Sequence, residues 1–228
     1  KVPDDKFIVV PNGIVWDDLQ GEACRDPFLL LNTSSPDRSL SALLRGFRKI
    51  KAQVPQARLQ WAYGWGVYDV NHADNPTALE WKRKMEAEIA STDGFIALGR
   101  VNHGDVAKLY QKASVLAYPT AFYEIDCLSA RKAQAGGCLP VATNFAALDT
   151  TVKFGTKVKV DEAKENWGKP YTFDFAIQDE ATLDLWVAAC VEALRKPMSE
   201  EARKPMREWA KQYEWTVITD IWHGALKT

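Results

Sequence analysis

The sequence predicts an α/β fold in which helices cover both faces of a parallel sheet. Short apolar runs alternate along the chain with longer segments of helical periodicity. The apolar runs are too short for helices and indicate buried strands. Strands and helices that alternate in this way are typical of a parallel sheet built by right-handed crossovers.

Each expected element follows from its own apolar pattern, taken in chain order. Strands are expected at residues 7–10, 28–31, 59–63, 95–98, 115–118 and 139–142. Helices are expected between them at residues 40–53, 78–90, 106–112 and 128–135. After a less regular stretch to residue 174, three more helices are expected at about 180–194, 200–211 and 215–226. This order predicts a Rossmann-like architecture: a single domain over residues 1–228, with a C-terminal helical segment from about residue 178.

Composition and charge exclude several classes of function. The chain has 228 residues, of which 46% are hydrophobic, enough to bury a full core. Lysine and arginine number 29 and aspartate and glutamate 30, which gives a formal net charge of −1. This charge offers no general attraction for nucleic acid or anionic lipid, so no nucleic-acid partner is expected. The four cysteines lack metal-ligand spacing, so neither a zinc site nor a disulfide framework is indicated.

The sequence also bears on localisation. No apolar stretch approaches the roughly 20 residues of a membrane-spanning helix, and residues 1–6 lack the apolar core of a signal peptide. We therefore expect a cytoplasmic protein without a transmembrane segment. Peripheral membrane contact by the full protein stays open.

Ligand-binding residues are expected in the loops after the strands, because an open parallel sheet binds ligands beyond the carboxyl ends of its strands. Small residues there, such as Ser35 and Gly64, let backbone amides approach a phosphate. Arg38 and Arg100 add fixed positive charge. These features suit a nucleoside diphosphate. A dinucleotide is disfavoured because no G-x-G-x-x-G follows the first strand, and no P-loop pattern occurs.

Residues 118–144, Y-P-T-A-F-Y-E-I-D-C-L-S-A-R-K-A-Q-A-G-G-C-L-P-V-A-T-N, resemble the donor-binding domain of group 1, family four glycosyltransferases. The sequence pattern of that family is P-[ST] after a strand, followed by E-x7-E, A-x-x-x-G and P-V-V-A-T. Residues 10–14 are similar to its V-P-N-G-[IV], residues 34–40 to its diphosphate segment, and residues 99–101 to its G-x-V segment beside the base. The helix at 215–222 resembles the one that returns toward the first domain. The resemblance covers nearly the whole chain.

The resemblance implies the C-terminal, donor-binding half of a GT-B-fold glycosyltransferase. The implied partners are a nucleotide diphosphate sugar and an N-terminal acceptor-binding domain that this chain lacks. The implied reaction transfers a sugar to an acceptor hydroxyl with retention of configuration, in glycan biosynthesis. We expect this half alone to bind nucleotide but to transfer little sugar.

The resemblance also implies roles for particular residues. Glu124 matches the first motif glutamate, which contacts hydroxyls of the donor sugar, and is the catalytic candidate. Arg38 matches the basic diphosphate ligand, and Cys127 and Leu128 would offer backbone amides. The nucleotide-sugar-binding candidates are Arg38, Ser35, Gly64, Arg100, Val101, Cys127, Leu128 and Lys132.

Three positions depart from the family pattern. Lys132 stands at the second motif glutamate, which binds ribose hydroxyls. A carboxylate accepts hydrogen bonds from hydroxyls, whereas an ammonium only donates and prefers a phosphate oxygen or another acceptor. Thr33 stands at the first basic position of the diphosphate loop. Asp126 is awkward beside a phosphate unless it caps the following helix and points away.

No D-x-D triplet occurs, which fits a reaction without a metal, and no cofactor is expected. Arg38 and helix dipoles would then stabilise the leaving diphosphate. Two alternatives stay open. One is a non-catalytic module that uses the same fold for protein interaction or nucleotide binding, which the three departures would suit. The other is a different GT-B-type enzyme, such as a sugar phosphorylase or a nucleotide-sugar epimerase.

Overall fold

A parallel sheet organises the computed structural model, which describes residues 7–21, 24–161 and 173–227. Within these ranges six parallel strands pair in the order β3-β2-β1-β4-β5-β6. The strands are β1 (Asp26–Asn32), β2 (Arg58–Trp61), β3 (Phe95–Ala97), β4 (Ala113–Tyr118), β5 (Leu139–Thr143) and β6 (Thr156–Val158). The predicted α/β fold with a Rossmann-like parallel sheet is confirmed.

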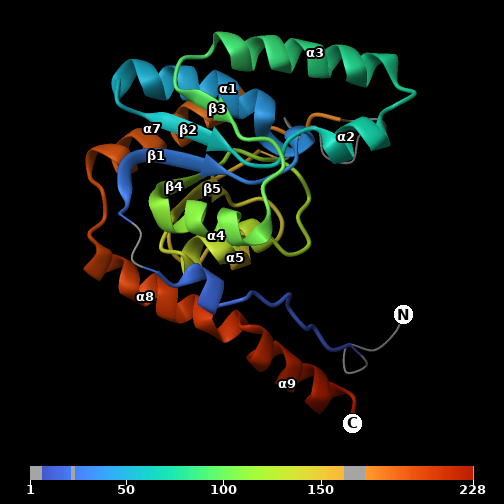
Figure 1. Cartoon of the computed structure of the whole chain (residues 1–228), viewed down its shortest axis with the longest axis vertical. Helices are drawn as coiled ribbons and strands as arrows, with labels where there is room; N and C mark the ends of the chain where they lie inside the picture. Colours follow the sequence, from blue (N-terminus) through green and yellow to red (C-terminus); the bar gives the residue numbers. More distant parts are fainter. Residues whose placement is uncertain (1–6, 22–23, 162–172, 228) are drawn as a thin grey trace.

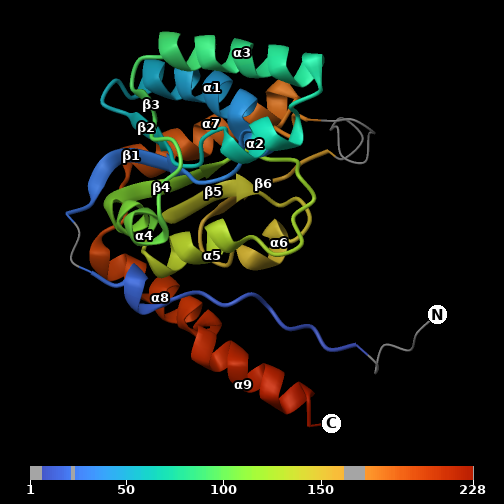
Figure 2. The same cartoon turned by 45° about the vertical axis from the view of Figure 1, so that its right-hand side comes forward.

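Helices cover both faces of this sheet (Figure 1). One face carries α1 (Pro36–Gln53), α3 (Pro76–Ser91) and α7 (Glu180–Arg195). The other carries α4 (His103–Lys112), α5 (Leu128–Ala135) and α8 (Glu200–Ala210). The shorter helices are α2 (Gly66–Asn71), α6 (Leu148–Thr151) and the 3-10 turns η2 (Asp17–Leu19) and η3 (Lys211–Tyr213). Helix α9 (Trp215–Ala225) continues beyond the sheet toward the C-terminus (Figure 2).

Helix α1 shows why these segments are helical. Leu40, Leu43, Phe47 and Ile50 recur at helical spacing and are fully buried, so one face of the helix packs on the sheet. Pro36 lies in the first turn, where its missing N–H has no helical partner to lose. The apolar stripe therefore sets the orientation of α1 and brings its first turn to the carboxyl edge of the sheet.

The central strands are apolar on both sides because both of their faces are covered. All six residues of β4 are buried. In β1, Leu30 packs into the layer with α1 and α7, whereas Leu29 and Leu31 pack into the layer with α4 and α5. Alternate side chains of a strand point to opposite faces, so β1 contributes to both halves of the core.

The expected strand at residues 7–10 is wrong. Phe7, Ile8 and Val9 are exposed, Val9 by 90%, and pair with no strand of the sheet. The sixth strand is instead β6 at the opposite edge from β3. Two of its three residues are exposed, so β6 lacks the apolar run by which a buried strand is found. Part of the expected irregular stretch before residue 174 lies outside the described residues.

The N-terminal segment is tied to the C-terminal helices. The backbone N–H of Ile14 donates to the carbonyl of Tyr213 at 2.7 Å, and that of Trp215 donates to the carbonyl of Ile14 at 3.2 Å. A Cβ on Gly13 would come within 2.4 Å of the Trp215 ring, so only glycine permits this approach. In the part of the chain that the structure describes, no helix has the length and apolar character to cross a membrane.

Trp186 joins α7, the sheet and α1. Its side chain is fully buried, and its indole Nε1 donates to the carbonyl of Val141 in β5 at 2.9 Å. The ring lies against Gly46 of α1, where a Cβ would come within 2.7 Å. This packing holds α1 and α7 together over the centre of the sheet.

We predict that Trp186→Ala lowers the free energy of unfolding by about 3–5 kcal/mol, because it leaves a cavity and removes the hydrogen bond to the carbonyl of Val141. Urea unfolding followed by far-UV circular dichroism measures the change. Trp222→Ala is the matched control, since that ring is 50% exposed on α9, and its effect should stay within about 0.5 kcal/mol. Equal losses for the two variants would contradict the assignment.

Candidate functional site

The candidate site lies at the carboxyl ends of β1 and β4. The chain builds β1, β2 and β3 outward in one direction and then returns to place β4 on the other side of β1. An open parallel sheet has its ligand crevice where the strand order reverses in this way. The loops after β1 and β4 both leave the sheet here. They bring together Arg38, from the first turn of α1, and Glu124, from the loop before α5.

Arg38 and Glu124 form an ion pair. Nη1 of Arg38 lies 2.8 Å from Oε1 of Glu124, and the hydroxyl of Tyr118 donates to the same oxygen at 2.5 Å. The Glu124 side chain is 6% exposed and that of Arg38 is 35% exposed. The guanidinium of Arg38 also stacks on the ring of Phe122, 4.2 Å from its centroid. Two side chains predicted to bind the ligand therefore hold each other in position.

The protonation states of this group follow from burial and from its neighbours. Burial acts to lower the pKa of Arg38, but the nearby Tyr118 and Glu124 outweigh it and raise the pKa, so the guanidinium stays charged. Burial raises the pKa of Tyr118 well above its usual value, and Cys127 and Glu124 add to this effect. The phenol of Tyr118 therefore stays protonated, and its O–H donates a hydrogen bond to Glu124. Among the described residues, Oε2 of Glu124 has no hydrogen-bond partner.

Two hollows meet at the first turn of α5. The first, here called the Glu124 hollow, measures about 500 Å³ and is lined by residues that include Glu124, Arg38 and Phe122. The second, the Lys132 hollow, measures about 460 Å³. Leu128 and Ser129 line both. A ligand that extends from one hollow into the other would cross the N-terminus of α5.

Of the two backbone amides expected to bind the ligand, those of Cys127 and Leu128, the N-terminus of α5 offers one. Cys127 is the N-cap residue, and no side chain caps the helix there. The N–H of Leu128 already donates to the carbonyl of Asp126 at 3.1 Å, whereas no acceptor for the N–H of Cys127 lies among the described residues. Burial raises the pKa of the Cys127 thiol to about 12, with the charge of Glu124 adding to it, so the thiol stays protonated.

Asp126 lines the Glu124 hollow and does not cap α5, but its carboxylate is paired within the fold. Its Oδ1 accepts from Nε of Arg131 at 2.7 Å, and its Oδ2 accepts from the backbone N–H and the Nδ2 of Asn12 at 2.8 and 3.1 Å. The guanidinium of Arg131 in turn stacks on Tyr213 at 3.6 Å. The charge of Asp126 is therefore balanced inside the fold, and the carboxylate links the N-terminal segment to α5.

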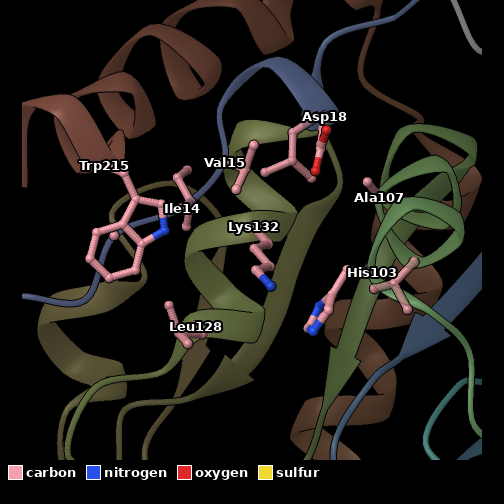
Figure 3. A pocket seen from close by; sticks show the side chains of 11 residues that line it. Ile14, Val15, Asp18, His103, Ala107, Leu128, Lys132 and Trp215 are labelled. Carbon is pink, nitrogen blue, oxygen red and sulfur yellow. The ribbon is translucent and has the colours of Figure 1, made fainter.

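The Lys132 hollow brings together Lys132, Arg100 and Val101, three of the predicted residues. Arg100 stacks on Tyr63, 5.3 Å from the ring centroid. Figure 3 shows Lys132 extending from α5 toward the side chains of Leu128 and His103.

Hydroxyl groups line the side of the Lys132 hollow nearest β1. The hydroxyl of Thr33 lies 2.5 Å from that of Tyr110 and donates to that of Ser129 at 3.0 Å. All three residues line the hollow. Thr33, which departs from the basic residue of the family pattern, is thus part of a hydroxyl network that reaches the first turn of α5.

Ser35 and Gly64 lie at the margin of the site. Ser35 lines a smaller hollow of about 160 Å³ beside Arg38 and does not cap α1 with its side chain. Gly64 is buried, lines none of these three hollows, and has a φ of 77°. A Cβ there would come within 3.0 Å of the backbone nitrogen of Arg100. The glycine therefore permits two loops to approach each other.

Sequence reasoning missed Tyr118 and Phe122 as site residues. Tyr118 is the last residue of β4, which lies where the strand order reverses. A polar side chain at the carboxyl end of such a strand could have been predicted as a site residue. Phe122 gives no such signal, because its contact with Arg38 depends on how the loop folds back. Across the described ranges, no three His, Cys, Asp or Glu side chains are grouped so as to hold a metal ion.

No protein-family model and no curated protein matches the sequence. Solved structures do match. Sucrose-phosphate synthase from Thermosynechococcus elongatus superimposes with a TM-score of 0.66 at 19% identity, over 96% of this chain and 51% of that one. A glycosyltransferase from Rickettsia africae ESF-5 gives 0.66 at 13% identity, over 95% of this chain and 55% of that one. Anabaena HepE in complex with UDP and glucose gives 0.65 at 14%, over 97% of this chain and 56% of that one.

These similarities establish the fold of the chain. It is a Rossmann-like α/β fold that matches one half of a GT-B structure. The chain spans about half the length of each of these three structures.

We predict that Arg38 and Glu124 are energetically coupled in the unliganded protein. In a double-mutant cycle with Arg38→Gln and Glu124→Gln, the coupling should be about 1–3 kcal/mol, because each single change leaves a half-buried or buried partner without its charge-assisted bond. Urea unfolding of the four proteins measures it. A parallel cycle on Lys108 and Asp105, an exposed pair on α4, should give a clearly smaller coupling. Strictly additive losses at Arg38 and Glu124 would contradict the pairing.

Proposed function

We propose that this chain is the donor-binding half of a glycosyltransferase that takes a sugar from a nucleotide diphosphate sugar. The observation that carries the proposal is the position of Glu124 in the crevice where the strand order reverses. There Arg38 and Tyr118 hold one of its oxygens, and the other stays unpaired among the described residues. A buried carboxylate with a free oxygen is suited to accept hydrogen bonds from sugar hydroxyls. The similarity in fold to HepE, solved with UDP and glucose, supports the same ligand class.

The two hollows suggest how such a donor lies. We place the sugar in the Glu124 hollow and the nucleoside in the Lys132 hollow, with the diphosphate over the first turn of α5 where the hollows meet. The N–H of Cys127, which has no acceptor in the described part of the chain, and the positive end of the α5 dipole favour a phosphate at this point. Arg38 has further donors besides the Nη1 that holds Glu124.

In this arrangement the chain would promote departure of the diphosphate. Negative charge develops on the phosphate oxygens as the bond to the sugar breaks, and Arg38 with the helix terminus would stabilise it. Glu124 would orient the sugar through its hydroxyls. We propose an acceptor hydroxyl as the attacking group, retention of configuration, no metal, and a cytoplasmic role in glycan synthesis.

An apolar surface on α9 suits the other half of such an enzyme. Trp215, Val217, Ile221 and Trp222 are each at least 40% exposed, and Val15 on the N-terminal segment is 51% exposed. A face of this kind is typical of a surface that another domain covers. Since the chain spans about half of its structural neighbours, we propose that an acceptor-binding domain packs here.

Nucleotide binding tests the proposal directly. We predict that one of UDP, GDP, ADP or TDP, or its sugar conjugate, raises the melting temperature of the 228-residue chain. A ligand at 100 times its dissociation constant adds about 2.7 kcal/mol, which corresponds to a shift of about 5–10 °C. The chain alone should transfer little sugar. A folded sample that responds to none of these ligands would instead favour the non-catalytic interaction module.

A second prediction concerns the role of Glu124. Glu124→Gln should weaken binding of the nucleotide sugar about tenfold while leaving the sugar-free nucleoside diphosphate bound at least as tightly. The reason is that the amide has one acceptor oxygen where the carboxylate has two, and it carries no charge, so it binds sugar hydroxyls less well and holds Arg38 less tightly away from the diphosphate. Isothermal titration calorimetry with both ligands separates these effects. Glu201→Gln, an exposed change on α8, is the control; a loss that is equal for both ligands would contradict the sugar contact.

A further inference from the structure

Lys132 is half-buried, and its ammonium has no partner among the residues that the structure describes. Neither a hydrogen bond nor an ion pair of its ammonium is found within the described ranges. Burial lowers its pKa, and only the charge of Asp18 acts in the opposite direction. Asp18 lines an adjoining hollow of about 280 Å³, drawn in Figure 3, whose lining also includes Lys132. No ion pair joins Asp18 and Lys132 among the described residues. A charge removed from water without compensation is unfavourable, so this position is suited to an anion from outside the fold.

Basic side chains gather in the Lys132 hollow. Its lining includes the basic side chains Arg100, His103 and Lys132, and it includes no aspartate or glutamate. Figure 3 shows the end of the Lys132 side chain beside the ring of His103. The same lining offers the amide of Asn102 and the hydroxyls of the Thr33 network, so a phosphate oxygen meets hydrogen-bond donors and positive charge there and no carboxylate that would repel it.

The Glu124 hollow, by contrast, has little charge to offer a diphosphate. The charge of Arg38 is balanced by Glu124, and that of Asp126 by Arg131. A nucleoside diphosphate sugar carries a negative charge on each phosphate. With Arg38 already paired, most of that charge needs a second cation.

Lys132 is within reach of the proposed phosphate position. Ser129 precedes it by three residues on α5, so the two side chains share one face of the helix. Ser129 lines both hollows at the first turn, and its hydroxyl accepts from Thr33. Ser129 therefore offers a hydroxyl in the first turn of α5, where the two hollows meet and one helical turn before Lys132.

We propose that Lys132 binds a phosphate oxygen of the donor and is the second cation of the diphosphate site, in place of a ribose contact. The inference rests on the proposed function. It states that the Lys132 hollow selects its ligand by the negative charge of a phosphate. In this arrangement Arg38 serves the sugar side of the diphosphate and Lys132 the nucleoside side.

Charge-changing variants of Lys132 test this assignment. The proteins are wild type, Lys132→Gln, Lys132→Arg, Lys132→Glu and the control Lys108→Gln, which alters an exposed lysine of α4 outside both hollows. The probes are inorganic pyrophosphate, the nucleoside diphosphates UDP, GDP, ADP and TDP, and the matching nucleosides. Calorimetry measures the diphosphates and ligand-observed NMR the nucleosides, and circular dichroism verifies that each variant is folded.

The expected result is a loss confined to phosphate. Lys132→Gln should lower the affinity for pyrophosphate and for the nucleoside diphosphate that binds about tenfold, which corresponds to the loss of one charge-assisted hydrogen bond. The affinity for the matching nucleoside should stay within about twofold of the wild-type value. Lys132→Arg should restore most of the affinity, Lys132→Glu should lower it further, and Lys108→Gln should have no effect.

Three results would overturn the assignment. Equal weakening of nucleoside and nucleoside diphosphate by Lys132→Gln would indicate a base or ribose contact, and tighter binding by Lys132→Glu would indicate a ribose site. Unchanged binding in Lys132→Gln would leave Lys132 without a role. If wild type binds none of the four nucleoside diphosphates, the proposed function fails. If pyrophosphate nevertheless binds in a way that depends on Lys132, the anion site is still supported. If pyrophosphate does not bind either, the proposal of an anion site at Lys132 fails as well.

Discussion

Burial of β4 along its whole length is the constraint on which the rest of the structure depends. A strand with apolar side chains on both faces needs cover on both faces. The chain provides it by building β1, β2 and β3 with α1 and α3, and by returning to form β4 beside β1 with α4 and α5 on the other face. The reversal this requires opens the crevice at the carboxyl ends of β1 and β4. The location of the site is therefore a consequence of how the core is covered.

Charge balance divides the crevice into two unlike parts. On the side of β4 and α1, Arg38 with Glu124 and Arg131 with Asp126 are paired, and each pair is held further by an aromatic ring. These pairs fix side-chain positions but contribute little net charge. On the side of β2 and α4, the cationic groups around Lys132 face an open hollow.

The positions that depart from the family pattern have defined surroundings in the structure. Asp126 joins the N-terminal segment to α5 through Asn12 and Arg131, so its carboxylate is a paired part of the framework that lines the Glu124 hollow. Thr33 extends a hydroxyl network to Ser129. Lys132 alone is left with an unpaired functional group among the described residues. Departures of the first two kinds change how the crevice is built, whereas that of Lys132 changes what the crevice offers to a ligand.

By itself the sequence determined the fold class and most of the elements. The apolar runs of β1, β4 and β5 and the helical stripe of α1 are local patterns, and burial imposes them wherever the chain is covered. Prediction from the sequence failed for the edge strands of the sheet. Residues 7–10 are apolar but do not form a strand, and β6 pairs with β5 although two of its three residues are polar. An edge position depends on which strand is adjacent, not on the segment's own pattern.

Only the tertiary structure decided how the candidate residues interact. Arg38 and Glu124 are 86 positions apart, and Asn12 and Asp126 are 114 apart. Motifs located them near one crevice, but no local pattern states which charge meets which. Pairing depends on the approach of loops from distant elements and on the water that their burial removes. For the same reason Lys132 reveals its lack of a partner only when its neighbours are in place.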